Sequence, residues 1–139
     1  MFITDNNLIV LEFTTRWLLA ILFFFQAYDR IFRIGLKEAA NIIYYQNTEQ
    51  KLPFWIVQAG TYVTAYLEFI SGILLFIGIF RDVALYILCV DMIFAAAGFS
   101  YLKPMWDMKH FFPRFILICI QLFLPESAYV LSLEKLFGN

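Results

Sequence analysis

The chain contains few charged residues for its length. Asp, Glu, Lys and Arg make up only 15% of its 139 residues, whereas a soluble domain carries about 25%. So few charges cannot cover the surface of a soluble globule of this size. The ten basic residues do not exceed the eleven acidic ones. The basic surface that binds DNA or RNA is therefore missing, and we expect no nucleic-acid partner.

Histidine and cysteine are also scarce. His110 is the only histidine, so the chain by itself cannot supply both ligands of a bis-histidine haem. Cys89 and Cys119 do not form a Cys-x-x-Cys pair, and no group of Cys and His has the spacing of metal ligands. We therefore expect no metal site. We interpret both thiols as small apolar side chains within helices.

Apolar residues dominate the chain instead. They make up 63% of it, and phenylalanine alone occurs 17 times, which excludes disorder. Four apolar runs, at 8–28, 54–80, 83–102 and 111–133, are each about as long as a helix that crosses a bilayer, ~17–25 residues. A membrane barrel would show alternating segments of about ten residues. We predict an all-α fold, an integral membrane antiparallel four-helix bundle that forms one transmembrane domain over residues 1–139.

The connections between the runs predict an orientation. The longest, residues 29–53, interleaves apolar residues with Arg30, Arg33, Lys37 and Glu38, which predicts a short amphipathic helix at the membrane interface. Six Lys or Arg residues lie in the first and third connections, against two in the second connection and the C-terminal tail. By the positive-inside rule, the first and third connections face the cytoplasm and both termini lie outside it.

Three charged residues fall at a similar predicted depth inside the apolar runs. A charge at mid-bilayer costs about 3 kcal/mol, so such residues are paired, line a wet cavity or serve a function. We counted residues from the end of each run that meets the first or third connection. The helical rise then places Arg16 about 18 Å deep, Glu68 about 21 Å and Asp91 about 16 Å. An up-down bundle lets three helices meet, so we predict an Arg16–Glu68–Asp91 cluster in its interior.

Other charged residues adjoin this predicted cluster. Arg114 and His110, one helical turn apart near the start of the fourth run, are placed at its mouth. Glu12 precedes Arg16 by four residues, so these two can also pair along one helix. Two interpretations remain open. The cluster is a polar pocket that binds the head of an amphiphile such as a quinone, or relays a proton. Alternatively, it is a salt-bridge network that only fixes the packing of the helices.

Part of the chain resembles a known family. Residues 66–81 place Glu68 before Gly72, an aliphatic run, Gly78 and Arg81, which resembles the second-helix pattern of the DoxX-like membrane proteins. Arg16 in the first apolar run and the Asp-Met-Ile-Phe-Ala-Ala sequence from Asp91 also resemble that family. The first run departs from it. Ala20 and Ala27 stand where glycines are frequent, and Arg30 takes the place of a lysine.

The resemblance implies a four-helix protein of the bacterial inner membrane. The founding member of the family is a small subunit of a thiosulfate:quinone oxidoreductase, and the wider group resembles cargo-binding membrane proteins of the eukaryotic secretory pathway. Arg16 and Glu68 are the two residues that the motif itself assigns. We expect an accessory subunit of a redox or cell-envelope complex, with other membrane subunits or a second copy as partners. No self-contained catalytic motif is present, so any part in an oxidoreductase is that of a non-catalytic subunit. The alternative is a structural, assembly or cargo-binding subunit.

Overall fold

Every regular element of the described structure is a helix. The computed structural model describes residues 5–46, 52–102 and 111–137. Its long helices are α1 (Asp5–Tyr28), α3 (Phe54–Ile77) and α4 (Arg81–Leu102). The shorter elements are η1 (Asp29–Ile34), α2 (Leu36–Gln46), α5 (Phe111–Phe123), η3 (Glu126–Ala128) and α6 (Leu133–Phe137). The all-α prediction is confirmed.

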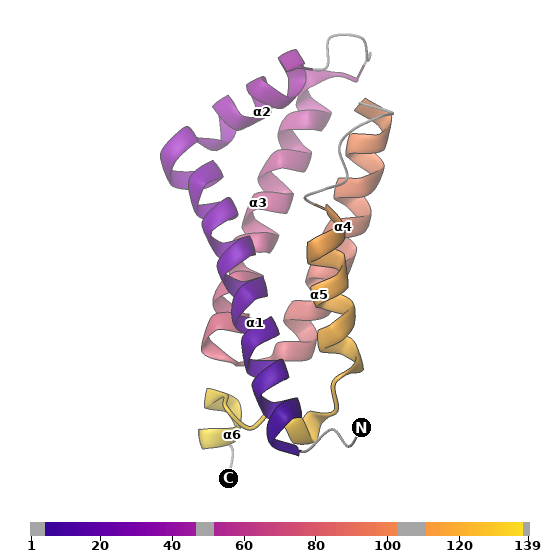
Figure 1. Cartoon of the computed structure of the whole chain (residues 1–139). Helices are drawn as coiled ribbons and strands as arrows, with labels where there is room; N and C mark the ends of the chain where they lie inside the picture. Colours follow the sequence, from indigo (N-terminus) through magenta and orange to yellow (C-terminus); the bar gives the residue numbers. More distant parts are fainter. Residues whose placement is uncertain (1–4, 47–51, 103–110, 138–139) are drawn as a thin grey trace.

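Four helices lie side by side and share one apolar core. α1 packs against α3 and α5, and α4 packs against the same two helices, as Figure 1 shows. The core takes residues from all four: Leu19, Ala20, Phe23, Leu75, Ala84, Leu85, Leu88, Met92 and Ile118. Helix α2 covers one end of this assembly, and α6 lies at the other (Figure 1).

Three helical stretches are long and apolar enough to cross a membrane. They are Asp5–Ile34, Phe54–Ile77 and Arg81–Tyr101, and they correspond to the first three predicted runs. The first stretch is longer than predicted, because η1 continues α1 beyond Tyr28 as a turn of π-helix. The second ends at Ile77, where Gly78 adopts a left-handed conformation (φ 74°) and its N–H donates to the Leu74 carbonyl (2.9 Å).

The fourth apolar run forms a shorter helix than predicted. Helix α5 ends at Phe123, ten residues before the predicted end of the run at residue 133. Its 13 residues span about 20 Å, less than the ~30 Å of a hydrocarbon core. Pro125 explains the end, because a proline removes a backbone donor and disfavours helical geometry in the residue before it.

The predicted amphipathic helix occupies only part of residues 29–53. Gly35, with φ 87°, separates η1 from α2, and such a backbone conformation favours glycine. Helix α2 packs against α3, and its Leu36, Ala39 and Ala40 are buried. Residues 29–34 of the connection therefore belong to the first long helical stretch, and residues 36–46 form a separate helix.

Candidate functional site

The buried charges form two separate groups rather than the single predicted cluster. Arg16 does not meet Glu68 and Asp91. Its guanidinium contacts the carbonyl of Leu75, close to the end of α3 that leads into α4. The predicted depth of Arg16 was wrong because it was counted from Tyr28, whereas the helical stretch continues to Ile34. Measured from Ile34, Arg16 lies about 27 Å along the stretch, beyond its middle.

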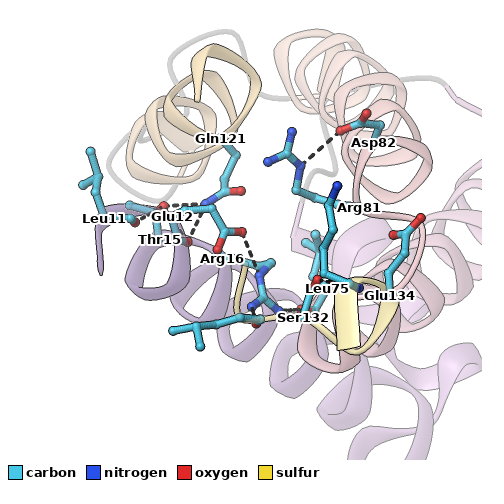
Figure 2. A network of polar contacts seen from close by, with 12 residues as sticks. Leu11, Glu12, Thr15, Arg16, Leu75, Arg81, Asp82, Gln121, Ser132 and Glu134 are labelled. Atoms are coloured by element: carbon cyan, nitrogen blue, oxygen red, sulfur yellow. Dashed lines mark hydrogen bonds and ion pairs between the residues drawn. The ribbon is translucent and has the colours of Figure 1, made fainter. Parts of the chain in front are cut away.

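The first group, here called the Arg16 cluster, consists of Glu12, Thr15, Arg16 and Gln121 (Figure 2). Arg16 is 1% exposed, and its Nε donates to Glu12 Oε1 at 2.8 Å. The predicted pairing along one helix is thus present. The Nη1 atom donates to the Leu75 carbonyl (2.8 Å) and Nη2 to the Leu131 carbonyl (2.5 Å). One side chain therefore joins α1, the end of α3 and the C-terminal segment.

Gln121 brings α5 into the same network. Its Nε2 donates to the Glu12 carbonyl (2.8 Å) and to Thr15 Oγ1 (2.5 Å), and Thr15 Oγ1 donates to the Leu11 carbonyl (2.6 Å). Gln121 was not among the predicted residues, although it is the only amide in the fourth apolar run. Because the Arg16 guanidinium is engaged by an internal carboxylate and by carbonyl groups, the cluster joins helices and leaves Arg16 little capacity for a ligand.

The second group, here called the Glu68 cluster, consists of Arg30, Glu68, Asp91 and Arg114. Arg30 forms a buried ion pair with Glu68 through its Nη2 atom, and its Nη1 lies 3.4 Å from Thr64 Oγ1. The sequence placed Arg30 in a connection. The π-turn η1 carries it inward instead, and π-turns occur frequently at functional sites. The persistence of apolar residues at Ile31, Phe32 and Ile34 was the signal that the helix continues.

Asp91 lies beside Glu68 in the interior. It is 1% exposed, and the two carboxyl groups are within hydrogen-bonding reach of each other. Apart from the Glu68 carboxyl group, no donor in the described part of the chain lies within hydrogen-bonding distance of either oxygen of Asp91. Buried carboxylates normally receive hydrogen bonds, since an unsatisfied buried acceptor costs about 1–3 kcal/mol or more. Asp91 is therefore a strong buried acceptor that the described side chains leave available.

Arg114 faces these carboxyl groups from the first turns of α5. It interacts electrostatically with Glu68 and Asp91 but forms no ion pair with either. Its guanidinium carbon lies 5.6 Å from the centre of the Phe23 ring, a cation–π arrangement. Two guanidinium groups and two carboxyl groups balance formally, so this cluster lacks the excess negative charge of the predicted one.

The remaining predictions can be placed briefly. Glu68, Asp91 and Arg114 come together, and Arg16 stands apart. His110, predicted at the mouth, lies outside the described residues. Cys89 and Cys119 are free and half-buried. Within the described ranges, no group of three or more His, Cys, Asp or Glu residues could hold a metal ion. The Glu68 cluster offers hydrogen-bond acceptors at Asp91 and a guanidinium group at Arg114, which lies against the buried Phe23 ring.

Comparison with known proteins identifies the family. No curated protein and no solved structure matches the chain significantly. The family described as DoxX matches residues 11–101, which include most of α1, all of η1, α2 and α3, and nearly all of α4. This match covers Arg16, Arg30, Glu68 and Asp91, and it stops before Arg114. The chain belongs to the DoxX family of membrane proteins.

Proposed function

We propose that this protein is a multi-pass subunit of the bacterial inner membrane whose Glu68 cluster binds the polar head of a quinone or a related amphiphile. In this proposal α1, α3, α4 and α5 form an antiparallel four-helix bundle in the bilayer, with both termini outside the cytoplasm. The protein acts as an accessory component of a redox, quinone-linked or cell-envelope complex. It binds other membrane subunits or a second copy of itself.

The Asp91 carboxylate is the observation that carries this proposal. It is buried at mid-helix, where a charge costs about 3 kcal/mol, and apart from the Glu68 carboxyl group no donor in the described ranges satisfies its oxygens. Each charged side chain of the Arg16 cluster makes at least one hydrogen bond inside the protein, although Glu12 Oε2 makes none. The contrast supports a role for Asp91 in binding.

The cluster also determines which head groups fit. Asp91 can accept a hydrogen bond, and the guanidinium group of Arg114 can donate one. A single hydroxyl group provides both, since it has one donor hydrogen and two acceptor lone pairs. The head of a reduced quinone carries such hydroxyl groups on an aromatic ring. The tail would extend into the lipid.

A specific observation also favours the structural alternative. The buried Arg30–Glu68 ion pair joins η1 to α3, and such a pair can serve to fix how helices pack. In that case the cluster is part of a structural, assembly or cargo-binding subunit, and no small amphiphile is needed. The two functions differ in what they predict for Asp91.

The test is the Asp91→Asn variant, which keeps the shape of the side chain and removes its charge. Purified wild-type protein and variant are titrated with decylubiquinol, kept reduced, and binding is followed by quenching of tryptophan fluorescence. We expect the wild type to bind and the variant to bind about tenfold more weakly, as for the loss of one hydrogen bond to a charged group. The thermal midpoint of unfolding should stay within a few degrees.

The matched control is Glu38→Gln, which changes an exposed carboxylate on α2 and should leave binding unchanged. Absence of saturable binding to the wild type contradicts the proposal. So does an Asp91→Asn variant that binds normally but unfolds at a much lower temperature, which is the result expected of a purely structural cluster.

A further inference from the structure

A polar cavity lies at the opposite end of the molecule from α2. It has a volume of about 350 Å³ and is enclosed by the start of α4 and by the C-terminal segment. Its polar lining residues are Arg81, Asp82, Glu126, Tyr129, Glu134 and Lys135. Figure 2 shows Arg81, Asp82 and Glu134 near the Arg16 cluster. None of the functions considered above uses this cavity.

The C-terminal segment is fixed in place against the α3–α4 turn. The Glu134 N–H donates to the Gly78 carbonyl (3.3 Å), and the Phe80 N–H donates to Glu134 Oε2 (3.1 Å). Tyr129 lies under two guanidinium groups, 4.9 Å from that of Arg81 and 5.4 Å from that of Arg16. Gly78 permits this approach, because a Cβ atom there would lie 2.9 Å from Ser132 Cβ. The walls of the cavity are thus built by specific contacts.

The lining presents unpaired groups of both signs. Arg81 is 6% exposed, and its Nε donates to Asp82 (3.1 Å), but its Nη1 has no hydrogen-bond partner among the described residues. Within those residues, Lys135 and Glu126 form no ion pair. Burial raises the pKa of Tyr129, which keeps its hydroxyl protonated and able to donate. The cavity therefore offers donors for an anionic group and a carboxylate for a cationic group.

The position of the cavity indicates where its ligand comes from. Two of the helices that are long enough to cross a membrane, α3 and α4, meet at the turn beside it. If both cross the bilayer, this turn lies at the level of the lipid headgroups. Phe80 is exposed at the turn, and Leu136 and Phe137 are exposed on α6. Such side chains insert into the boundary between headgroups and acyl chains.

We propose that this cavity binds the headgroup of a zwitterionic phospholipid that carries a phosphate and a primary ammonium group, as phosphatidylethanolamine does. The phosphate is bound by Arg81 and Lys135, and the ammonium group by Glu126 and Glu134. The acyl chains extend past Phe80 into the bilayer.

The charges of the cavity argue against other phospholipids. Three carboxylates and two cationic side chains line it, so a purely anionic headgroup such as phosphatidylglycerol adds charge to a lining that is already slightly negative. A choline headgroup has no N–H and cannot donate to the carboxylates. An ammonium group satisfies them by charge-assisted hydrogen bonds.

The inference depends on the proposed membrane embedding but not on a ligand of the Glu68 cluster. The two sites lie at different levels of the helix assembly and share no residue. A protein that binds the phospholipid but no quinol would contradict the proposed function alone.

Native mass spectrometry of the detergent-purified full chain tests the proposal. The protein is titrated with short-chain phosphatidylethanolamine, phosphatidylcholine and phosphatidylglycerol, and with water-soluble phosphoethanolamine. We expect phosphatidylethanolamine to bind about tenfold more tightly than the other two lipids, as for one additional charge-assisted hydrogen bond. Phosphoethanolamine should bind far more weakly, because it lacks the acyl chains.

Variants link the binding to the cavity. Arg81→Gln should lose most of the affinity for phosphatidylethanolamine. Because Arg81 is buried and its loss can impair folding, two changes at exposed positions complete the test. Lys135→Gln should weaken phosphatidylethanolamine binding, and Glu126→Gln should abolish the preference for it over phosphatidylglycerol. Asp5→Asn, an exposed acidic position on α1, is the control and should change nothing.

Three results would overturn the proposal. Equal binding of the three phospholipids removes the headgroup selectivity. Unchanged lipid binding in both Lys135→Gln and Glu126→Gln removes the cavity as the site. Phosphoethanolamine that binds as tightly as the lipid makes the free compound the ligand and excludes the lipid assignment.

Discussion

At the scale of residues, the buried guanidinium group of Arg16 and the half-buried one of Arg114 have different surroundings. Arg16 donates to one carboxylate and two carbonyl groups of the protein, whereas Arg114 forms no ion pair with the carboxyl groups that it faces. Because guanidinium groups are always charged and rich in donors, an arginine whose donors are used internally stabilises the fold. We assign this role to Arg16, whereas the proposed function places Arg114 beside the ligand.

The structural role of Arg16 predicts a loss of stability in Glu12→Gln. Removing the carboxylate leaves a fully buried guanidinium without its ion-pair partner, a change that costs about 3 kcal/mol. The thermal midpoint of unfolding in detergent should fall well below that of the wild type. Glu38→Gln serves here as the surface control, with little effect expected. An unchanged midpoint in Glu12→Gln would show that the Arg16 cluster does not hold the helices together.

The sequence identified the buried charges but not how they are grouped. Glu68 and Asp91 come together as predicted from their depths, because α3 and α4 are joined by a short turn and their relative level is fixed locally. The predicted depth of Arg16 depended on where the first helix ends. We placed that end at Tyr28, because the charged residues Asp29 and Arg30 that follow resemble the polar end of a membrane span. Only tertiary structure shows that Arg30 turns inward to Glu68 and that the charged stretch remains helical.

At the scale of elements, the close approach of α1 and α3 depends on a glycine. A Cβ atom at Gly72 would lie 2.9 Å from the backbone nitrogen of Phe24, so the two backbones are in direct contact there. Small residues permit such contacts between membrane helices. The sequence alone does not show which helix approaches Gly72.

We therefore predict that Gly72→Ala forces α1 and α3 apart. Overpacking of this kind costs about 2 kcal/mol, and the midpoint of thermal unfolding should fall accordingly. Gly60→Ala is the matched control in the same helix. A Cβ atom there would meet nothing within 4 Å, and alanine favours a helix more than glycine does, so stability should not decrease. Equal midpoints for the two variants would contradict the packing described here.

The ends of the helices differ in how well the sequence predicts them. Helix α3 begins at the predicted residue, because Pro53 precedes it and apolar residues follow without interruption. The fourth run was predicted ten residues too long, because residues 124–133 remain largely apolar although they fold back under the other helices. There Leu124, Ala128 and Tyr129 are buried, so the apolar character of these positions reflects contact with protein rather than a continuing helix.

At the scale of the whole molecule, the buried polar groups lie at two different heights along the helix assembly. The Arg16 cluster and the C-terminal segment secure one end of the helix assembly, and the Glu68 cluster lies further inside. Membership of the DoxX family and three long apolar helices agree with the class expected from composition. The short α5 and the separation of the clusters were not predictable, because both depend on how the chain folds back on itself.

The central claim is that the Glu68 cluster binds an amphiphile, and the composition of the purified protein tests it most directly. Wild-type protein and Asp91→Asn are purified in mild detergent, and the molecules extracted from each are identified by mass spectrometry. We predict that the wild type carries a quinone-class amphiphile in stoichiometric amount and that Asp91→Asn, equally folded, carries much less. A wild-type protein that carries only bulk phospholipid, or equal amounts of the same amphiphile in both proteins, would contradict the account.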